Sequence, residues 1–173
     1  YFVFAGLQDA LDYLEGFGFS DDDIAFLRST ERFDADFLDY LAHLCFTGGA
    51  RAMPEGTIFF ANEPVIEVSG PVIEAQLAET YLLNQVNLQT VLATKASRVV
   101  HAAAGQAVVD FGARRTQGTD AGNKLARACY MVGFAGTSNV QAGARYGIPI
   151  VGTTAHSFVT VFEDEADSFR AYG

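Results

Sequence analysis

The fold is decided by residues 107–151, which read AVVDFGARRTQGTDAGNKLARACYMVGFAGTSNVQAGARYGIPIV. An apolar strand at 107–111 is followed by a polar loop at 112–120 and then by a helix to residue 134, with Leu125, Ala128, Cys129 and Val132 on one face. A short strand at 134–138, a small helix at 139–147 and a strand at 148–152 repeat this order. Alternating strands and helices of this kind are typical of a parallel sheet or barrel.

The residues upstream predict a mixed layer of helices and strands. Helices are expected at 5–18, 20–29 and 34–44, and Ser20 is a suitable N-cap for the second. Residues 56–70 indicate two strands joined around ANEP, and Pro71 then opens a long helix that runs to residue 105. We therefore expect an α/β protein with two parts. Residues 1–104 form an α+β domain, with helices, a small strand sandwich and a long linking helix, and residues 105–173 form the first βα units of an incomplete parallel α/β barrel.

The composition of the chain excludes several classes of protein. Half of the 173 residues are hydrophobic, which is enough for a buried core. No apolar run approaches the roughly 18 residues that span a membrane, and no signal-peptide pattern opens the chain, so we expect a cytoplasmic protein without a membrane partner. Cys45 and Cys129 lie far apart in apolar patterns, which fits reduced thiols, and no metal-ligand spacing is present.

The distribution of charge points to a small anionic ligand. A formal net charge of -10 argues against nucleic acid as a partner. Between residues 95 and 145, however, the only acidic residues are Asp110 and Asp120, against seven basic ones, which are Lys95, Arg98, Arg114, Arg115, Lys124, Arg127 and Arg145. This part of an acidic protein is therefore locally basic.

The candidate site residues lie where strands are expected to end. In parallel α/β proteins, ligands bind beyond the carboxyl ends of the strands. If the predicted strands are neighbours, one site gathers Arg114 or Arg115 together with Thr137, Ser138, Asn139, His156 and Ser157. Guanidinium groups bind carboxylates and phosphates, hydroxyls and helix-start amides add donors, and a histidine can take up a proton or a phosphoryl group. The alternatives are that the arginines form surface or subunit ion pairs and that the histidine is structural.

Several segments resemble nicotinate phosphoribosyltransferases: YFVFAGLQDALDYL (1–14), MPEGTIFF (53–60), VSGPVIEAQLAETYLLNQVN (68–87), VVDFGARRTQGTDAG (108–122) and GFAGTSNVQAGARYGIPIVGTTAHSFV (133–159). The resemblance implies an enzyme of NAD salvage that joins nicotinate to phosphoribosyl pyrophosphate, with ATP hydrolysis and Mg²⁺. His156 matches a histidine that is transiently phosphorylated. Arg114 and Arg115 match an arginine pair that helps to bind the nicotinate carboxylate or the phosphoribosyl donor, and Ser157, Thr137, Ser138 and Asn139 match pocket positions.

The resemblance also implies that this chain is a fragment. Members of the family are much longer and form homodimers, so we expect an N-terminal segment and later barrel strands to be missing here and the chain alone to have little activity. Asn123 and Lys124 stand where the family more usually has apolar or small residues. We interpret the two residues as surface variation.

Two alternative functions stay open. One is a related phosphoribosyltransferase that takes nicotinamide or quinolinate. The other is a non-catalytic ligand-binding or assembly piece, in which residues 54–70 form a carrier-like strand sandwich and the βα part only packs. Transfer of phosphate from ATP to His156 would decide in favour of the enzyme.

Overall fold

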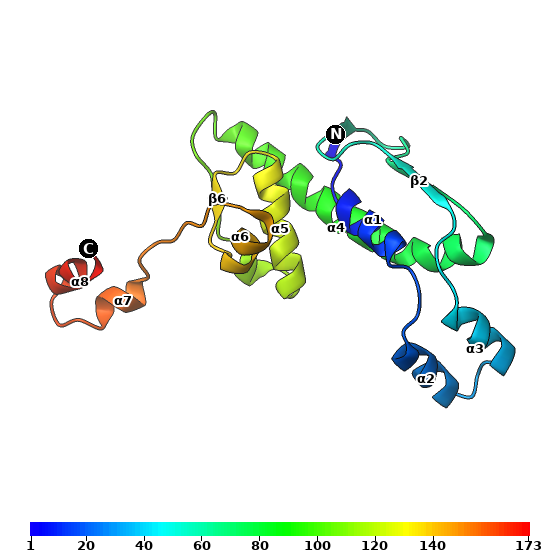
Figure 1. Cartoon of the computed structure of the whole chain (residues 1–173). Coiled ribbons are helices and arrows are strands. Elements are labelled where there is room, and N and C mark those ends of the chain that lie inside the picture. The colour runs from blue at the N-terminus through cyan, green and yellow to red at the C-terminus, as the bar shows by residue number, and fades with distance from the viewer.

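A single long helix organises the fold. In the computed structural model, which describes residues 1–173, helix α4 (Val72–Ala102) runs along the molecule and the other elements lie on it (Figure 1). Pro71 precedes its first residue, as the sequence predicts. The buried side chains of α4 are mostly small or polar, because β1 and helices α1 and α5 pack closely along it. Two threonines of α4 hold the N-terminal segment: Thr94 Oγ1 accepts from Val3 N (2.9 Å), and Thr90 Oγ1 accepts from Ala5 N (3.2 Å).

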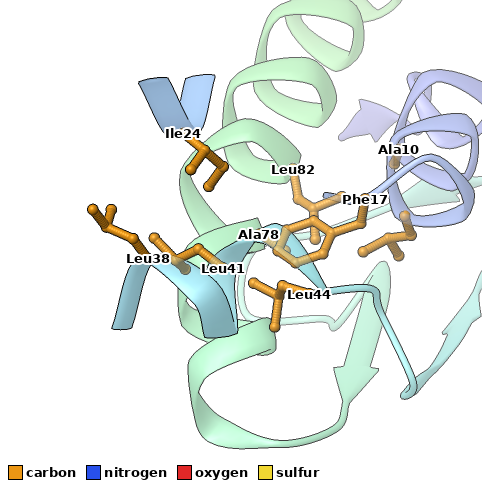
Figure 2. Close-up of a cluster of buried hydrophobic side chains, with 9 residues drawn as sticks. Ala10, Phe17, Ile24, Leu38, Leu41, Leu44, Ala78 and Leu82 are labelled. Atoms are coloured by element: carbon orange, nitrogen blue, oxygen red, sulfur yellow. The ribbon is translucent and has the colours of Figure 1, made fainter. Parts of the chain in front are cut away.

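Three short helices precede α4, in the places that the sequence predicts. They are α1 (Leu7–Glu15), α2 (Asp21–Ser29) and α3 (Ala35–Ala42). Ser20 caps α2, because its hydroxyl accepts from Asp23 N while its own N–H donates to the Asp23 carboxylate. The helices and α4 enclose one hydrophobic core, shown in Figure 2, made of Ala10, Leu14, Phe17, Ile24, Leu38, Leu41, Leu44, Ala78 and Leu82.

The N-terminal strands form two separate antiparallel pairs. Strand β1 (Phe2–Val3) pairs with β3 (Ile58–Phe59), and β2 (Gly49–Ala52) pairs with β4 (Ile66–Ser69). Both strands predicted around ANEP are therefore present as β3 and β4, but they do not pair with each other. Each finds a partner elsewhere in the chain, and for β3 that partner lies more than 50 residues away.

The second half of the chain contains the predicted parallel βα units. Strand β5 (Val109–Asp110) pairs in parallel with β6 (Gly136–Thr137), and the connection between them passes through the 3₁₀ turn η1 (Ala113–Arg115) and helix α5 (Thr119–Met131). Helix α6 (Val140–Tyr146) then leads to Ile150, which forms a single parallel bridge with Thr137. The strand predicted at 148–152 is thus reduced to one bridge. Pro149 contributes to this, because it has no N–H to donate to a ladder.

Helix α5 joins the two halves of the chain. On one side Ala128 packs with Val3, Ala5 and Ala93 in a buried cluster, and on the other Ala126 packs with Ala142 and Ile148. The predicted domain boundary at residues 104 and 105 falls in the turn after α4. The boundary between two domains at this turn stays a prediction. Helix α5, which follows the turn, shares buried contacts with the N-terminal layer.

The last two helices lie apart from the rest of the molecule. Figure 1 shows α7 (His156–Thr160) and α8 (Glu165–Tyr172) beyond an extended segment. They contact each other through the rings of Phe158 and Tyr172, whose centroids are 6.0 Å apart. None of the helices, α4 included, combines the length and apolarity that a membrane crossing needs.

Candidate functional site

A polar pocket of about 420 Å³ lies at the carboxyl ends of β5 and β6, between the first turns of α5 and α6. No carboxylate is among its lining residues, which are Ala113, Thr116, Gly118, Thr119, Gly122, Asn123, Ser138, Asn139, Val140 and Gln141. This is the position at which the parallel βα pattern predicts a ligand site.

A buried carboxylate links the two strand-end loops behind this pocket. Asp110, only 4% exposed, is the last residue of β5. Its Oδ1 accepts from Gly112 N (2.8 Å), and its Oδ2 accepts from the hydroxyl of Thr137 (2.7 Å) on β6. The backbone of Ser138 donates to the carbonyl oxygen of Asp110 (2.9 Å). Both loops are therefore held at the same level of the sheet.

A chain of amide side chains extends from Thr137 across the pocket. Thr137 Oγ1 accepts from Asn139 N (3.0 Å), and Asn139 Oδ1 caps α6 by accepting from Ala142 N (3.1 Å). Asn139 Nδ2 donates to Asn123 Oδ1 (3.0 Å), and Asn123 Nδ2 donates to Gln141 Oε1 (3.0 Å). Helix α5 is thereby tied to the loop that opens α6.

The interpretation of Asn123 and Lys124 as surface variation is wrong, because each residue is only 5% exposed. The Lys124 ammonium pairs with Asp120 one turn earlier on the helix. The prediction counted one buried face of α5, whereas the helix has two, one against α4 and one against α6. Gly122 and Ala126, small residues on either side of this pair, are the sequence signal that could have indicated the second buried face.

Arg114 and Arg115 lie beside the pocket with their guanidinium groups unpaired. Both are exposed in η1, between Ala113 and Thr116, which line the pocket. Neither guanidinium group makes a hydrogen bond or an ion pair within the chain. Other basic residues of this region do have partners, as in the pairs of Lys124 with Asp120 and Arg127 with Glu55. The ion-pair alternative for Arg114 and Arg115 is therefore not realised inside this chain.

His156 and Ser157 lie away from the pocket. Both are exposed, at the first two positions of α7, and neither lines the pocket. The reason is visible in the backbone. Val151 N still donates to Thr137 O (3.0 Å), but residues 152–155 make no backbone hydrogen bond to the sheet, and the chain then leads outward (Figure 1). Of the predicted site residues, Ser138 and Asn139 line the pocket, and Thr137 accepts from Asn139 N. Arg114 and Arg115 lie in the chain between two lining residues, whereas residues 156 and 157 lie apart from the pocket.

The pocket is chemically suited to an anionic ligand. Thr116, Thr119 and Ser138, which carry hydroxyl groups, line it, as do the first residues of α5 at the positive end of that helix. Two arginines follow the lining residue Ala113 in the chain. The chain contains no group of three or more His, Cys, Asp or Glu side chains arranged to hold a metal ion.

Parallel βα units with a polar pocket at their carboxyl ends define the chain as part of an α/β protein with the usual place for a ligand site. Residues 1–87 match the nicotinate phosphoribosyltransferase (NAPRTase) N-terminal domain, and residues 106–169 match the nicotinate phosphoribosyltransferase (NAPRTase) family. The chain belongs to the nicotinate phosphoribosyltransferase family.

Two bacterial relatives agree with this assignment. Nicotinate phosphoribosyltransferase pncB2 of Mycobacterium tuberculosis is 53% identical over 172 residues, which are 99% of this chain and 37% of that protein. The nicotinate phosphoribosyltransferase of Bacillus subtilis is 46% identical over 99% of this chain and 35% of its own length. The chain therefore spans about a third of the length of these relatives.

Solved structures show the same arrangement of elements. The crystal structure of human nicotinic acid phosphoribosyltransferase superposes with a TM-score of 0.83, at 39% identity, over 93% of this chain and 33% of that one. The structure of a nicotinate-nucleotide pyrophosphorylase from Pyrococcus furiosus superposes with a TM-score of 0.77, at 26% identity, over 99% of this chain and 36% of that one. Both likenesses support the α/β fold class.

Proposed function

We propose that the chain is part of a nicotinate phosphoribosyltransferase that forms nicotinate mononucleotide and pyrophosphate from nicotinate and phosphoribosyl pyrophosphate in NAD salvage. One observation carries the proposal: a strand-end pocket with two unpaired arginines beside it, in a chain that belongs to this family. The polar lining suits a substrate with several negative charges.

The arginines provide a basis for choosing nicotinate. In the transfer, the pyridine nitrogen bonds to the anomeric carbon of the ribose while the bond from that carbon to pyrophosphate breaks. Such a site needs positioned cations and donors more than a strong base. A guanidinium of Arg114 or Arg115 would pair with the nicotinate carboxylate, whereas the neutral amide of nicotinamide would leave that charge without a partner. Thr137, Ser138 and Asn139 would supply or position neutral donors.

His156 is proposed as the phosphoryl carrier that couples ATP hydrolysis to the transfer, with Ser157 beside it. A ring nitrogen would bond to the γ-phosphorus of ATP as the bond to ADP breaks, and water would later release the phosphate. The exposed side chain of His156 has no partner in the chain, which leaves the ring free for this reaction. The role requires residues 152–160 to lie against the strand ends in the working enzyme.

The donor set of the chain does not fit a magnesium site made by the protein. No carboxylate lines the pocket, and both oxygens of Asp110 already accept hydrogen bonds from the chain. Magnesium commonly binds through substrate phosphates with only one or two protein carboxylates. We therefore assign Mg²⁺ to the phosphates of ATP and phosphoribosyl pyrophosphate, and no residue of this chain to the metal.

The assembly and location of the enzyme are part of the proposal. We propose a homodimer, which is supported by apolar side chains that α4 leaves exposed, among them Val72, Leu83 and Val91. A cytoplasmic location is proposed as well, because both cysteines are free thiols. We also propose little activity for this chain alone. Two paired strands and one bridge cannot close a barrel around a substrate.

The test uses the longest natural form of the chain. Release of pyrophosphate and formation of nicotinate mononucleotide are measured with nicotinate or nicotinamide, with and without ATP. We expect turnover of nicotinate with a preference of at least tenfold over nicotinamide, and loss of that preference in Arg114→Leu or Arg115→Leu. A folded protein that uses nicotinamide equally well, or that makes no nucleotide, contradicts the proposal.

A second measurement tests His156 directly. The protein is incubated with ATP labelled at the γ-phosphate, and acid-labile phosphate is mapped in the wild type and in His156→Ala, with His101→Ala as the matched control. Label that disappears only in His156→Ala supports the carrier role. A folded, active wild type without label assigns His156 to another role.

A further inference from the structure

We propose that Asn123 is a positioning residue whose buried carboxamide fixes the loop Thr137–Asn139 against α5 and so sets the shape of the strand-end pocket. The kinetic part of this inference rests on the proposed function, whereas the structural part does not. It goes beyond the residues expected to contact substrate, since Asn123 acts through Asn139.

The geometry places Asn123 at the centre of the network. Its Oδ1 is the only hydrogen-bond partner of Asn139 Nδ2 within the chain, and its Nδ2 donates to Gln141 Oε1, both at 3.0 Å. Asn139 in turn donates its backbone N–H to Thr137 Oγ1 and caps α6 through Ala142 N. One side chain of α5 therefore holds the cap, the loop and the first turn of the next helix.

Close packing of α5 makes this contact specific. A Cβ at Gly122 would lie 3.2 Å from Thr116 Oγ1 and 3.8 Å from Asn139 Nδ2, so the helix lies close to both loops of the pocket. Asn123 itself is 5% exposed. An apolar side chain there would leave the amide hydrogens of the half-buried Asn139 without their acceptor in the chain, and removing one partner of a buried hydrogen bond costs more than the bond itself contributes.

The consequence for the pocket passes through Ser138. Ser138 lies between the two anchored residues and lines the pocket, and its hydroxyl makes no hydrogen bond within the chain. The direction of that hydroxyl, and of the first N–H groups of α6, depends on where Asn139 is held. Positioning of this kind affects a transition state strongly, because small displacements of polar groups weaken its stabilisation.

The experiment compares three variants in the longest natural form of the chain. Asn123→Leu removes both hydrogen bonds. Asn123→Asp keeps an acceptor for Asn139, and the exposed Gln141 can turn its amide to donate to the new carboxylate. Gln8→Leu is the matched control, because it also replaces an amide side chain by leucine and removes a hydrogen bond, to Asp12 on α1, outside the pocket. The first readout is hydrogen exchange at the backbone amides of Asn139 and Ala142, which requires no activity.

We expect Asn123→Leu to speed this exchange at least tenfold and to lower kcat/KM for phosphoribosyl pyrophosphate about tenfold. Asn123→Asp should stay within about threefold of wild type on both readouts, and Gln8→Leu should match wild type. If Asn123→Leu does not fold, Asn123→Ser, which is polar but too short to reach both partners, takes its place with the same expected result.

Two results would overturn the inference. One is unchanged exchange at Asn139 and Ala142 in a folded Asn123→Leu or Asn123→Ser protein. The other is a lowered melting temperature with an unchanged kcat/KM, because a merely structural residue behaves in that way. A wild type that makes no nucleotide contradicts the proposed function instead, and the exchange measurement then still decides the role of Asn123.

Discussion

Replacing Arg127 by methionine removes the ion pair that ties α5 to the N-terminal layer. Glu55 Oε1 accepts from Gly6 N (2.6 Å), Leu7 N (3.1 Å) and Arg127 Nη1 (3.0 Å), while Oε2 accepts from Arg127 Nη2. The side chains of Arg127 and Glu55 are only 24% and 18% exposed. Methionine keeps much of the buried stem, so the variant tests the charge and its hydrogen bonds.

The expected loss follows from this geometry. Removing one partner of a fully buried pair costs about 3–5 kcal/mol, since the remaining charge loses its compensation. Here about a fifth of each side chain is exposed and Glu55 keeps two backbone donors. We therefore expect Arg127→Met to lower the free energy of unfolding by about 2 kcal/mol at pH 7. The loss is smaller than for a fully buried pair because the remaining charge of Glu55 is partly compensated.

The pH dependence identifies the carboxylate as the cause. Burial alone would raise the pKa of Glu55, but hydrogen bonds from Arg127, Gly6 and Leu7 and the charge of Arg127 outweigh burial, so its pKa lies below the ordinary value of 4.5. A group with a lowered folded pKa stabilises the protein fully above the unfolded pKa and loses that contribution as the pH falls through the folded pKa. The contribution of the pair should thus persist from pH 5 to 8 and vanish in more acidic solution.

The assay is a double-mutant cycle in denaturant, with Arg127→Met, Glu55→Gln and the double variant. We expect a coupling energy of roughly 2 kcal/mol at pH 7 that declines toward pH 3. The control is Asp167→Asn, which breaks an ion pair between two exposed side chains: Asp167 is 60% exposed and Arg170 is 73% exposed. This variant should change the free energy of unfolding by less than about 0.5 kcal/mol. A coupling energy below about 0.5 kcal/mol at pH 7, or one that is equal at pH 3 and pH 7, would refute the reasoning.

Two further predictions concern the thiols and one glycine. Burial, with the charge of Asp110, raises the pKa of the Cys129 thiol to about 12, whereas Cys45 is exposed. Ellman's reagent at pH 8 should therefore titrate one thiol in this segment before denaturation and two after it, and Cys45→Ser should abolish the native reaction. Gly6 has φ 99°, at which a side chain causes backbone strain of roughly 1–3 kcal/mol. A Cβ there would also lie 2.7 Å from the Gln85 carbonyl oxygen, so Gly6→Ala should lower the free energy of unfolding by more than this strain alone. Gly56→Ala is its control, with φ 85° but open space around the Cβ, and equal effects of the two would contradict the role of the close approach.

Local features of the sequence predicted most of the helices. Ser20 and Asp23 form the capping box, Gly16 ends α1, and Pro71 precedes α4, because caps and breakers act on the neighbouring turn only. The partners of β3 and β4 could not be predicted in this way. Short strands are stabilised by whichever segment the fold brings beside them, and for β3 that segment is the N-terminus.

The same distinction between local features and long-range contacts holds for the candidate site. The strand-end loops and their polar residues could be predicted, since parallel βα units place their loops at one edge of the sheet. The burial of Asn123 could not, because a helix pressed between two neighbours has no simple polar face. The outward course of residues 152–155 could not be predicted either. These residues make no backbone hydrogen bond to the sheet, and their sequence does not indicate this.

The sequence by itself thus determined the order of helices and strands, the family, and the type of chemistry that the basic strand-end loops favour. These depend on side chains acting within one turn or one loop. Only the tertiary structure decided which loops meet, because hydrogen bonds such as Thr137 to Asp110, Asn139 to Asn123 and Arg127 to Glu55 join residues 16 to 72 positions apart. Contacts of that range form only when the packing of α5 between α4 and α6 holds their donors and acceptors within reach.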